Sequence, residues 1–481
     1  MTRATLVAVS TSLIVLSACE LDIEALTAEA GTPHDAGRHD GGMRDADRPD
    51  GASTDGSRAD AGGDAGPALE DAGMPAPPAA AHGFDFPSDI VVESSAIGSF
   101  GTVVVGHGTR SLAGGSDQAF WATSIDADGA VTYATAFGGQ FNDQLFAVDA
   151  DAAHVYAVGF TRTFAFGAAM ARNNDAVLVE LGDSGVLSTR HMGIAGADET
   201  LFAIHTDDSG WVAGGRTAPG SDVLADALVI IGMPLTAWSI DLGQRDTVRG
   251  IATTPSRIYA VGTYQDASDP TNSRGFVLSI ERSTGVLEWG RSVLGESFAE
   301  LKRVRVDASG QLVVVGRRDG RGLRLEVSDI GALLSAEEVD VPQLVDTVLT
   351  SNGAELLAGT RMTDGYLLRR LGSRYVGTYV AGLGLVAPFG EVLRASATSG
   401  ATIVLQRGAR DVFLVGIDEV GATECASTAL PLDATVPSSL TFEPIDSAVL
   451  GTWAPIAGWR DAAFTPQTID EAPSPASACG P

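Results

Sequence analysis

The sequence predicts an all-β protein, a seven-bladed β-propeller of four-stranded blades, preceded by a disordered tether. Three observations predict this fold class. A pattern of short apolar strands recurs seven times at intervals of about fifty residues, which is the size of a propeller blade. Tight-turn residues separate the strands of each copy. No stretch of the repeat region has a sustained helical period.

A glycine that closes the second strand of each copy marks the repeat, as in Tyr259-Ala-Val-Gly262. The markers are Gly106, Gly159, Gly214, Gly262, Gly316 and Gly359, with Gln406 in the seventh copy. Successive markers are 53, 55, 48, 54, 43 and 47 residues apart. Closing seven such sheets into a ring would remove free sheet edges, which promote aggregation.

The third strand of each copy follows a polar loop that often ends in aspartate. Five such aspartates recur: Asp117, Asp175, Asp226, Asp364 and Asp411. We interpret them as turn residues, because aspartate side chains bond nearby backbone amides in turns. A ring of inward carboxylates that binds a cation is the alternative. The hairpin into the fourth strand carries small polar residues and glycine, as in Asp126-Ala-Asp-Gly129.

Residues 1–18 have the pattern of a bacterial lipoprotein signal peptide. Arg3 precedes an apolar stretch from Leu6 to Leu16, which is too short to span a membrane comfortably. The stretch ends in Leu16-Ser-Ala-Cys19, which resembles a lipobox. We therefore expect Cys19 to become the lipidated first residue of the mature protein. An ordinary secretory signal with a chance cysteine is the alternative.

Residues 19–82 are expected to form a disordered tether. The segment repeats Asp-Ala-Gly, as at Asp60 and Asp64, and ends in a Pro/Ala-rich run. It has too little apolar bulk to offset the entropy cost of folding. The stretch from Asp45 to Gly51 has a faint likeness to a calcium-binding loop. It lacks the remaining ligands, so a solvated tether is the favoured interpretation.

Residues 83–435 are expected to form the propeller, and residues 436–481 a C-terminal extension. The chain is strongly acidic, with 61 Asp and Glu against 31 Lys and Arg and a net charge of −30. Proteins bind nucleic acid largely by neutralising phosphates with Lys and Arg, so the charge argues against a nucleic-acid partner. It also argues against docking on anionic lipid. We expect a monomer that contacts the membrane through its lipid anchor only.

Two cysteines remain if Cys19 is lipidated. Because exported proteins meet oxidising conditions, we expect Cys425 and Cys479 to form a disulfide. Counted from the turn glycine, Cys425 occupies the place that Trp289 has in the fourth copy. It should therefore lie on the outer strand of the seventh blade, where Cys479 could join the extension to it. Two free thiols are the alternative.

We find no catalytic, cofactor-binding or metal-binding residues in the sequence. Gly182-Asp-Ser184-Gly185 matches the stretch around a trypsin-like nucleophile, but it occupies a hairpin turn and lacks the residues that follow in those enzymes. The histidines of the repeat region lack metal-ligand spacing and are assigned structural or surface roles: His107, His154, His191 and His205. The tryptophans are expected to pack between blades: Trp121, Trp211, Trp238 and Trp289.

Several features of the repeats are shared with a known family. They are the Val-Gly strand ends, the aspartate of the third strand, Asp126-Ala-Asp-Gly129 and Phe137-Gly-Gly139. They resemble the repeats of predicted secreted bacterial β-propeller (SBBP-like) proteins, which are common as lipoproteins in myxobacteria. The resemblance covers most of residues 88–435 and implies a fold, not a function. The fourth copy, with Thr284-Gly285 and Trp289, is also similar to quinoprotein-type repeats. That family includes the assembly lipoprotein BamB and quinone-dependent dehydrogenases.

We therefore expect a non-enzymatic propeller, anchored in the cell envelope at the outer membrane or cell surface. It would present one face to a protein or glycan partner, and no cofactor is expected. A hydrolase or lyase acting on polysaccharide is the first alternative, with carboxylates from several blades converging at one mouth of the ring. A BamB-like component of envelope assembly is the second.

Overall fold

The computed structural model describes part of the chain. The described residues are 81–476, apart from gaps at 113–114, 167–172, 219–223, 267–268, 297, 351–353, 362–363, 373, 381–383, 386–392, 396–400, 418–426, 436, 438–439, 446–449 and 451–452. The predicted signal peptide, Cys19, the tether up to residue 80, Cys425 and Cys479 all lie outside them. Within the described part of the chain, no helix is long and apolar enough to cross a membrane.

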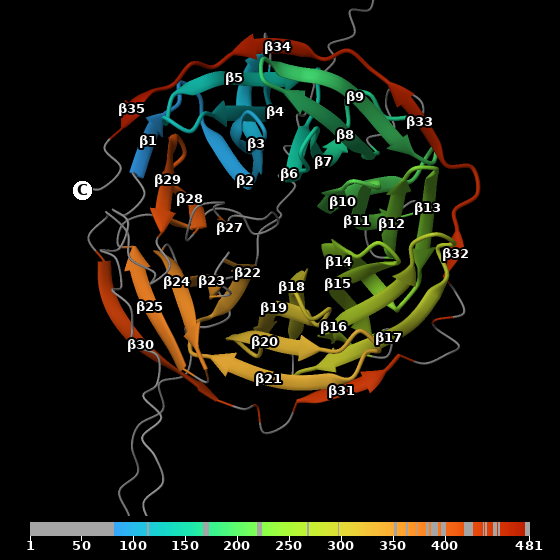
Figure 1. Ribbon diagram of the computed structural model, residues 1–481. Helices are drawn as coiled ribbons and strands as arrows, with labels where there is room; N and C mark the ends of the chain where they lie inside the picture. The colour runs from blue at the N-terminus through green and yellow to red at the C-terminus, as the bar shows by residue number, and fades with distance from the viewer. Residues whose placement is uncertain are drawn as a thin grey trace, which may run out of the picture. The chain divides into compact units, whose positions relative to one another are not determined.

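The described strands form a ring of seven antiparallel blades around one axis, so the predicted propeller is confirmed (Figure 1). The innermost strands of blades 1 to 7 are β2 (Ile90–Gly98), β6 (Asp143–Ala150), β10 (Asp198–Asp207), β14 (Gln244–Thr253), β18 (Ala299–Val306), β22 (Gln343–Leu349) and, in blade 7, β26 (Gly384–Leu385) with β27 (Leu393–Ala395). The second strands are β3 (Gly101–Leu112), β7 (Val155–Thr161), β11 (Gly210–Ala218), β15 (Arg257–Asp266), β19 (Leu312–Arg318), β23 (Glu355–Arg361) and β28 (Ala401–Arg407).

The outer half of each blade follows the same plan. The third strands are β4 (Gly115–Ile125), β8 (Asp175–Gly182), β12 (Asp226–Gly232), β16 (Asp269–Glu281), β20 (Arg321–Val327), β24 (Asp364–Leu371) and β29 (Asp411–Ile417). The fourth strands are β5 (Val131–Gly138), β9 (Gly185–Gly193), β13 (Leu235–Ile240), β17 (Leu287–Leu294), β21 (Leu333–Val339), β25 (Arg374–Val380) and, in blade 7, β1 (Ala81–Asp85).

The N-terminal strand β1 closes the ring. It pairs with β29 from Ala81 opposite Val415 to Asp85 opposite Asp411. β1 thus occupies the outer position of blade 7 at which the sequence placed Cys425, a residue outside the described part of the chain. The physical reason lies in the residues that start the propeller. Phe84 and Phe86 are buried, and the Phe86 ring packs edge-on against Trp121 of blade 1 at 4.8 Å. Apolar burial therefore holds the two ends of the propeller together.

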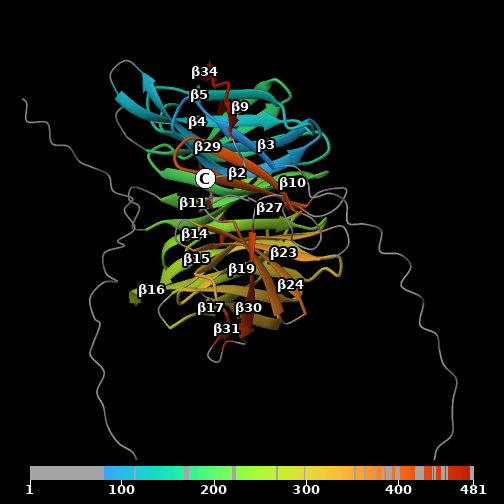
Figure 2. The ribbon, with the colours of Figure 1, turned by 90° about the vertical axis from the view of Figure 1, so that its left-hand side faces the viewer.

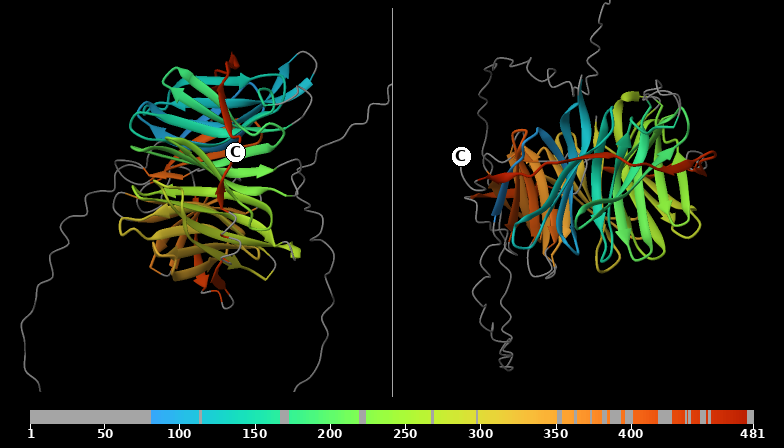
Figure 3. Two further views of the ribbon diagram at one scale, coloured as in Figure 1. Left: turned by 90° about the vertical axis from the view of Figure 1, so that its right-hand side faces the viewer. Right: turned by 90° about the horizontal axis from the view of Figure 1, so that it is seen from above.

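The C-terminal segment forms a circumferential belt that adds a fifth strand outside the blades (Figures 1 and 3). Its strands are β30 (Ser427–Thr435), β31 (Thr441–Pro444), β32 (Ala454–Pro455), β33 (Arg460–Ala463), β34 (Gln467–Asp470) and β35 (Ser474–Ala476). β30 pairs with blades 6 and 5, and the next strands pair with blades 4, 3, 2, 1 and 7 in turn. The belt thus makes one circuit against the direction of the blades, and the expected extension begins earlier, with β30.

Belt side chains also contribute to the cores between the blades. Trp453 stacks on Trp238 of blade 3 with 5.8 Å between ring centroids, and Phe464 stacks on Phe164 at 4.1 Å. Ile445 packs in the cluster between blades 3 and 4. Figure 2 shows β34 and β31 at opposite ends of the ring's rim. The belt is therefore held by apolar burial as well as by strand pairing.

A β-bulge interrupts the innermost strand of blades 1 to 6 at the same level. A glycine of the second strand lies opposite each bulge: Gly106, Gly159, Gly215, Gly262, Gly316 and Gly359. A Cβ atom would lie 1.8–2.0 Å from a carbonyl oxygen of the bulged strand at five of these glycines, and 3.0 Å from one at Gly359. The recurring glycine therefore exists to admit the bulge. In blade 3 this residue is Gly215, so the sequence-based marker Gly214 was wrong by one position.

The glutamine that replaces the glycine in blade 7 joins the last blade to the first. The Gln406 side chain accepts a hydrogen bond from the Val92 amide at 3.2 Å. Its amide nitrogen donates to the Ile90 carbonyl at 2.6 Å. This exception to the repeat therefore has a structural reason, because the glutamine pairs with the backbone of blade 1.

Replacing Gly106 with alanine should lower the free energy of unfolding by about 2–4 kcal/mol, as for strained core backbone. The added Cβ would lie 1.9 Å from the Val91 carbonyl oxygen, so backbone must move. Gly108→Ala is the matched control on the same strand, where the nearest atom is the Asp89 carbonyl oxygen at 3.3 Å. Chemical unfolding checks both. Equal losses in the two variants would contradict the role given to the bulge.

Candidate functional site

Each bulge leaves one residue of the innermost strand without a partner in the second strand. These bulge residues are Glu93, Phe146, Phe202, Arg249, Lys302 and Val345. Bulges re-aim side chains, and they are common near functional sites. The sequence contains a signal for these residues, since each lies 13 or 14 residues before the glycine opposite its bulge. The sequence prediction did not use this spacing.

Contacts among the bulge residues show that several meet near the axis. The rings of Phe146 and Phe202 are 5.1 Å apart, and the Arg249 guanidinium lies 4.5 Å above the Phe202 ring. Glu93 of blade 1 interacts electrostatically with Arg249 of blade 4, on another side of the ring. Burial raises the pKa of Glu93 well above its usual range, and Arg249 opposes this rise. Apart from Arg249, the bulge residues are buried, so they fill the axis at this level.

A cavity of about 330 Å³ lies beyond the bulge residues, where the innermost strands end. Asp149 in its wall contacts Arg394 of blade 7 and His205 of blade 3, each at 3.2 Å. Burial alone would raise the pKa of Asp149, but Arg394 and His205 lower it to about 2. Arg394 also donates to the Ser95 carbonyl at 2.7 Å. The wall of this cavity is therefore charged and is held by contacts between several blades.

Two further cavities open on the same side of the ring, which we call the hairpin face. On this face lie the turns between first and second strands and between third and fourth strands. A cavity of about 630 Å³ lies between blades 7 and 1, and one of about 510 Å³ lies between blades 5 and 6. Ile97 borders both the cavity between blades 7 and 1 and the 330 Å³ cavity near the axis. Leu349 borders both that axial cavity and the cavity between blades 5 and 6. The three cavities therefore follow one path across the hairpin face.

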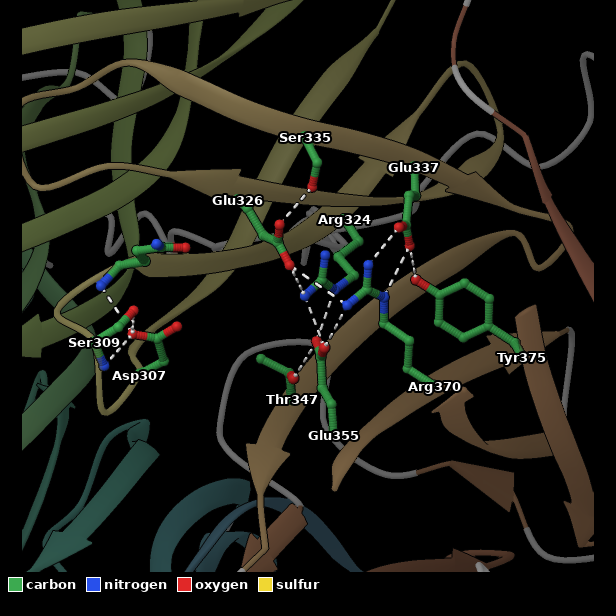
Figure 4. Close-up of polar contacts among 11 residues, drawn as sticks. Asp307, Ser309, Arg324, Glu326, Ser335, Glu337, Thr347, Glu355, Arg370 and Tyr375 are labelled. Carbon is green, nitrogen blue, oxygen red and sulfur yellow. Dashed lines mark hydrogen bonds and ion pairs between the residues drawn. The ribbon is translucent and has the colours of Figure 1, made fainter. Parts of the chain in front are cut away.

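The cavity between blades 5 and 6 has a polar network in its wall (Figure 4). Arg324 is 1 % exposed, and its Nε and Nη2 atoms each donate to a Glu355 oxygen at 2.7 Å. Nη2 also donates to Glu326 Oε1 at 2.7 Å. Nearby, Arg370 Nη2 donates to Glu337 Oε1 at 2.6 Å, and the Tyr375 hydroxyl donates to the other oxygen of that carboxylate. Charge-assisted bonds of this kind fix the shape of the wall.

The network brings two carboxylates together, because Glu326 and Glu355 both bond to the same nitrogen of Arg324. Two nearby carboxyls are the arrangement that a glycosidase uses, but one of them must keep its proton near neutral pH. Burial alone would raise the pKa values of Glu326 and Glu337, yet hydrogen bonds from Arg324 and Arg370 lower both. Glu326 therefore stays ionised and does not suit the role of the general acid in such a pair.

The recurring aspartates lie on the third strands, away from the axis. Asp175, Asp226, Asp364 and Asp411 each begin a third strand, and Asp117 lies within β4. Asp175 accepts a hydrogen bond from the Phe166 amide at 2.5 Å and contacts His191 at 3.0 Å. Asp411 pairs with Arg407 at 2.9 Å. These contacts are local, as the turn interpretation expects. No group of three or more possible metal ligands occurs among the described residues.

The other residues singled out in the sequence are dispersed. Ser184 lies in the exposed turn between β8 and β9. His107 approaches Glu93 at 3.7 Å, and burial lowers its pKa to about 4. Trp289 donates from Nε1 to the Asp329 carbonyl of blade 5 at 3.0 Å. Trp121 is fully buried, and Trp211 is 6 % exposed. The tryptophans thus pack between blades, as expected, and none of these residues joins the network of Figure 4.

No family model matches the chain. No curated protein matches it either. Among solved structures, the chain is similar to a protein of unknown function from Bacteroides caccae, with 12% identity and a TM-score of 0.30. That match covers 73% of this chain and 99% of the other.

Replacing Arg324 with methionine should lower the free energy of unfolding by about 3–5 kcal/mol, because the buried Glu355 carboxylate loses both hydrogen bonds from Arg324 while its other cation, Arg370, lies 3.8 Å away. The matched control is Arg190→Met, which breaks the more exposed ion pair with Asp461 of the belt. That change should cost less than about 1 kcal/mol. Chemical unfolding at neutral pH measures both, and equal costs would contradict the account.

The cost of Arg324→Met should also depend on pH. The pKa values of Glu326 and Glu337 are lowered in the folded protein. Their contribution to stability is therefore present above the usual glutamate pKa and is lost as the pH falls through the lowered values. The difference between the parent protein and the variant should narrow on acidification. A difference that widens at acidic pH would contradict the assigned ionisation states.

Proposed function

We propose that the protein is an anchored, extracytoplasmic, non-enzymatic binding propeller that captures a protein or glycan partner on its hairpin face. The observation that supports this most is the path of three neighbouring cavities across that face. Ligand sites are concave and carry a few placed polar groups. A path of this kind fits an extended ligand better than a single small molecule.

The chemistry of the path supports a polar partner. Its walls carry both arginines and carboxylates, among them Arg394 with Asp149 and Arg324 with Glu355. These groups can donate to and accept from the hydroxyl groups of a glycan or the backbone of a peptide. The belt covers the outer strands, so pairing of a partner strand with the rim is a less favourable mode.

The anchoring part of the proposal rests on the sequence. The lipobox-like Leu16-Ser-Ala-Cys19 and the acidic, glycine-rich segment after it support lipidation at Cys19 and a long tether. A tether of this composition would allow the propeller to reach partners some distance from the membrane. We assign the protein to the cell envelope, at the outer membrane or cell surface.

Partner capture by the full-length chain in its own host tests this function. Ile97→Trp and Leu349→Trp place a bulky ring at the two junctions between cavities and should each reduce the captured partner at least tenfold. The matched control is Leu224→Trp, at an exposed position on the opposite side of the ring. Affinity purification with quantitative mass spectrometry, including glycan analysis, gives the result. Undiminished capture by both junction variants, with all variants folded, would refute the assignment of the face.

We also propose a disulfide between Cys425 and Cys479. The belt supports it, because Ser427 pairs with blade 6 and Ala476 pairs with blade 7, the neighbouring blade. The bond would close a loop of about 50 residues and stabilise the fold by about 4 kcal/mol in the chain-entropy model. Intact mass of the exported protein under non-reducing conditions should show two thiol hydrogens missing. Two alkylatable thiols in the exported, unreduced protein would contradict the disulfide.

A further inference from the structure

Five basic side chains, two of them from bulge residues, gather between blades 3, 4 and 5, toward the side of the ring opposite the hairpin face. They are Arg216, Arg249, Lys302, Arg303 and Arg317. This is unexpected in a chain with twice as many acidic as basic residues. Lys302 is the sole lysine of the sequence, and it is 7 % exposed.

One carboxylate, that of Glu300, contacts three of these cations. Glu300 contacts Arg317 Nε at 2.9 Å, Arg249 Nε at 3.8 Å and Lys302 Nζ at 3.9 Å. Arg303 instead donates to the backbone carbonyl of Arg249 at 2.5 Å and to that of Lys302 at 3.1 Å. Glu93 also faces Arg249, but its raised pKa favours the neutral form. These contacts therefore gather several cations around the Glu300 carboxylate.

Two of these cations have lowered pKa values, and burial is the largest cause in both. Burial lowers the pKa of Lys302 to about 8, and Arg317, Arg249 and Arg303 add to the effect while Glu300 opposes it. Burial likewise lowers the pKa of Arg249 to about 10. Like charges in a poorly hydrated setting repel one another. An anion placed among them would relieve that repulsion.

Aromatic rings lie against two of the arginines, Arg249 and Arg317. The guanidinium of Arg249 lies 4.5 Å from the Phe202 ring centroid, and that of Arg317 lies 4.3 Å from the Phe298 centroid. An arginine stacked on a ring keeps its N–H edge available, and this edge matches the geometry of a carboxylate or phosphate. The Arg249 and Arg317 side chains are 19% and 32% exposed, whereas that of Lys302 is 9% exposed. The two arginines are thus more accessible to solvent than the lysine.

We propose that this cationic cluster is a binding site for the oxyanion group of a small ligand, a carboxylate, phosphate or sulfate. Arg249 and Arg317 would donate hydrogen bonds to the oxygens of the anion. The positive charge of the more buried Lys302 would attract the anion. The site lies toward the side of the ring opposite the cavities, so its failure and the failure of partner capture are separate results.

The single lysine makes the test direct. Full-length protein labelled with ¹³C-lysine gives one Lys302 Cε resonance, whose pH titration reports the pKa of this residue. Inorganic phosphate, sulfate and glucuronate are added in turn, with chloride at the same ionic strength as the reference. A bound oxyanion should raise the pKa of Lys302 by about one unit, because a nearby opposite charge favours the charged form. Binding of phosphate or sulfate without glucuronate, or the reverse, would identify which oxyanion chemistry the site takes.

Two variants separate ligand binding from a structural role. Arg317→Gln should lower the affinity for the anion at least tenfold. Glu300→Gln should raise that affinity, because it removes the carboxylate that competes with the anion. A cluster that only supports the fold would gain nothing from the second change. Arg190→Gln on the rim is the control and should leave the titration unchanged. The proposal is overturned if none of the three anions shifts the Lys302 titration, or if folded Arg317→Gln responds like the parent protein.

Discussion

The close approach of a bulged inner strand to a glycine of the second strand is the constraint on which the rest of the structure depends. At Gly159 a Cβ atom would lie 1.8 Å from the Gln144 carbonyl oxygen. A bulge adds one residue to the inner strand and re-aims its side chain. Repeated in six blades, it supplies the side chains that fill the axis, including Phe202 and Arg249. The glycine repeat is therefore the sequence counterpart of the bulge residues near the axis.

The belt pairs with the outer strands of the blades, which would otherwise be exposed sheet edges. Each blade ends in an outer strand with unpaired backbone groups, and such edges are templates for aggregation. The belt strands pair with these edges, and side chains such as Trp453 and Phe464 pack against the blades. Because the rim is covered, the binding that we propose would use the two faces of the ring. The hairpin face carries the neighbouring cavities, and the cationic cluster lies toward the other.

The sequence predicts the parts of the fold that repeat, because each repeat carries the same local requirement. Gly262 and Asp175 are examples, one at a bulge and one at a turn. The belt could not be predicted, since strands as short as Ala454–Pro455 have no periodic signal and their partners lie far away in sequence. Closure by β1 is equally non-local. The network around Arg324 was missed because its members come from different strands and share no spacing.

Hydrogen exchange followed by mass spectrometry on the full-length protein tests the central claim, that the belt seals the rim of the ring. Amides in Arg460–Ala463 and Gln467–Asp470 pair with blades 2 and 1. They should exchange slowly, together with the outer strands β9 and β5, because hydrogen-bonded amides exchange only on opening. Exchange of both belt segments within seconds, at the rate of an unstructured peptide, would contradict a sealed rim.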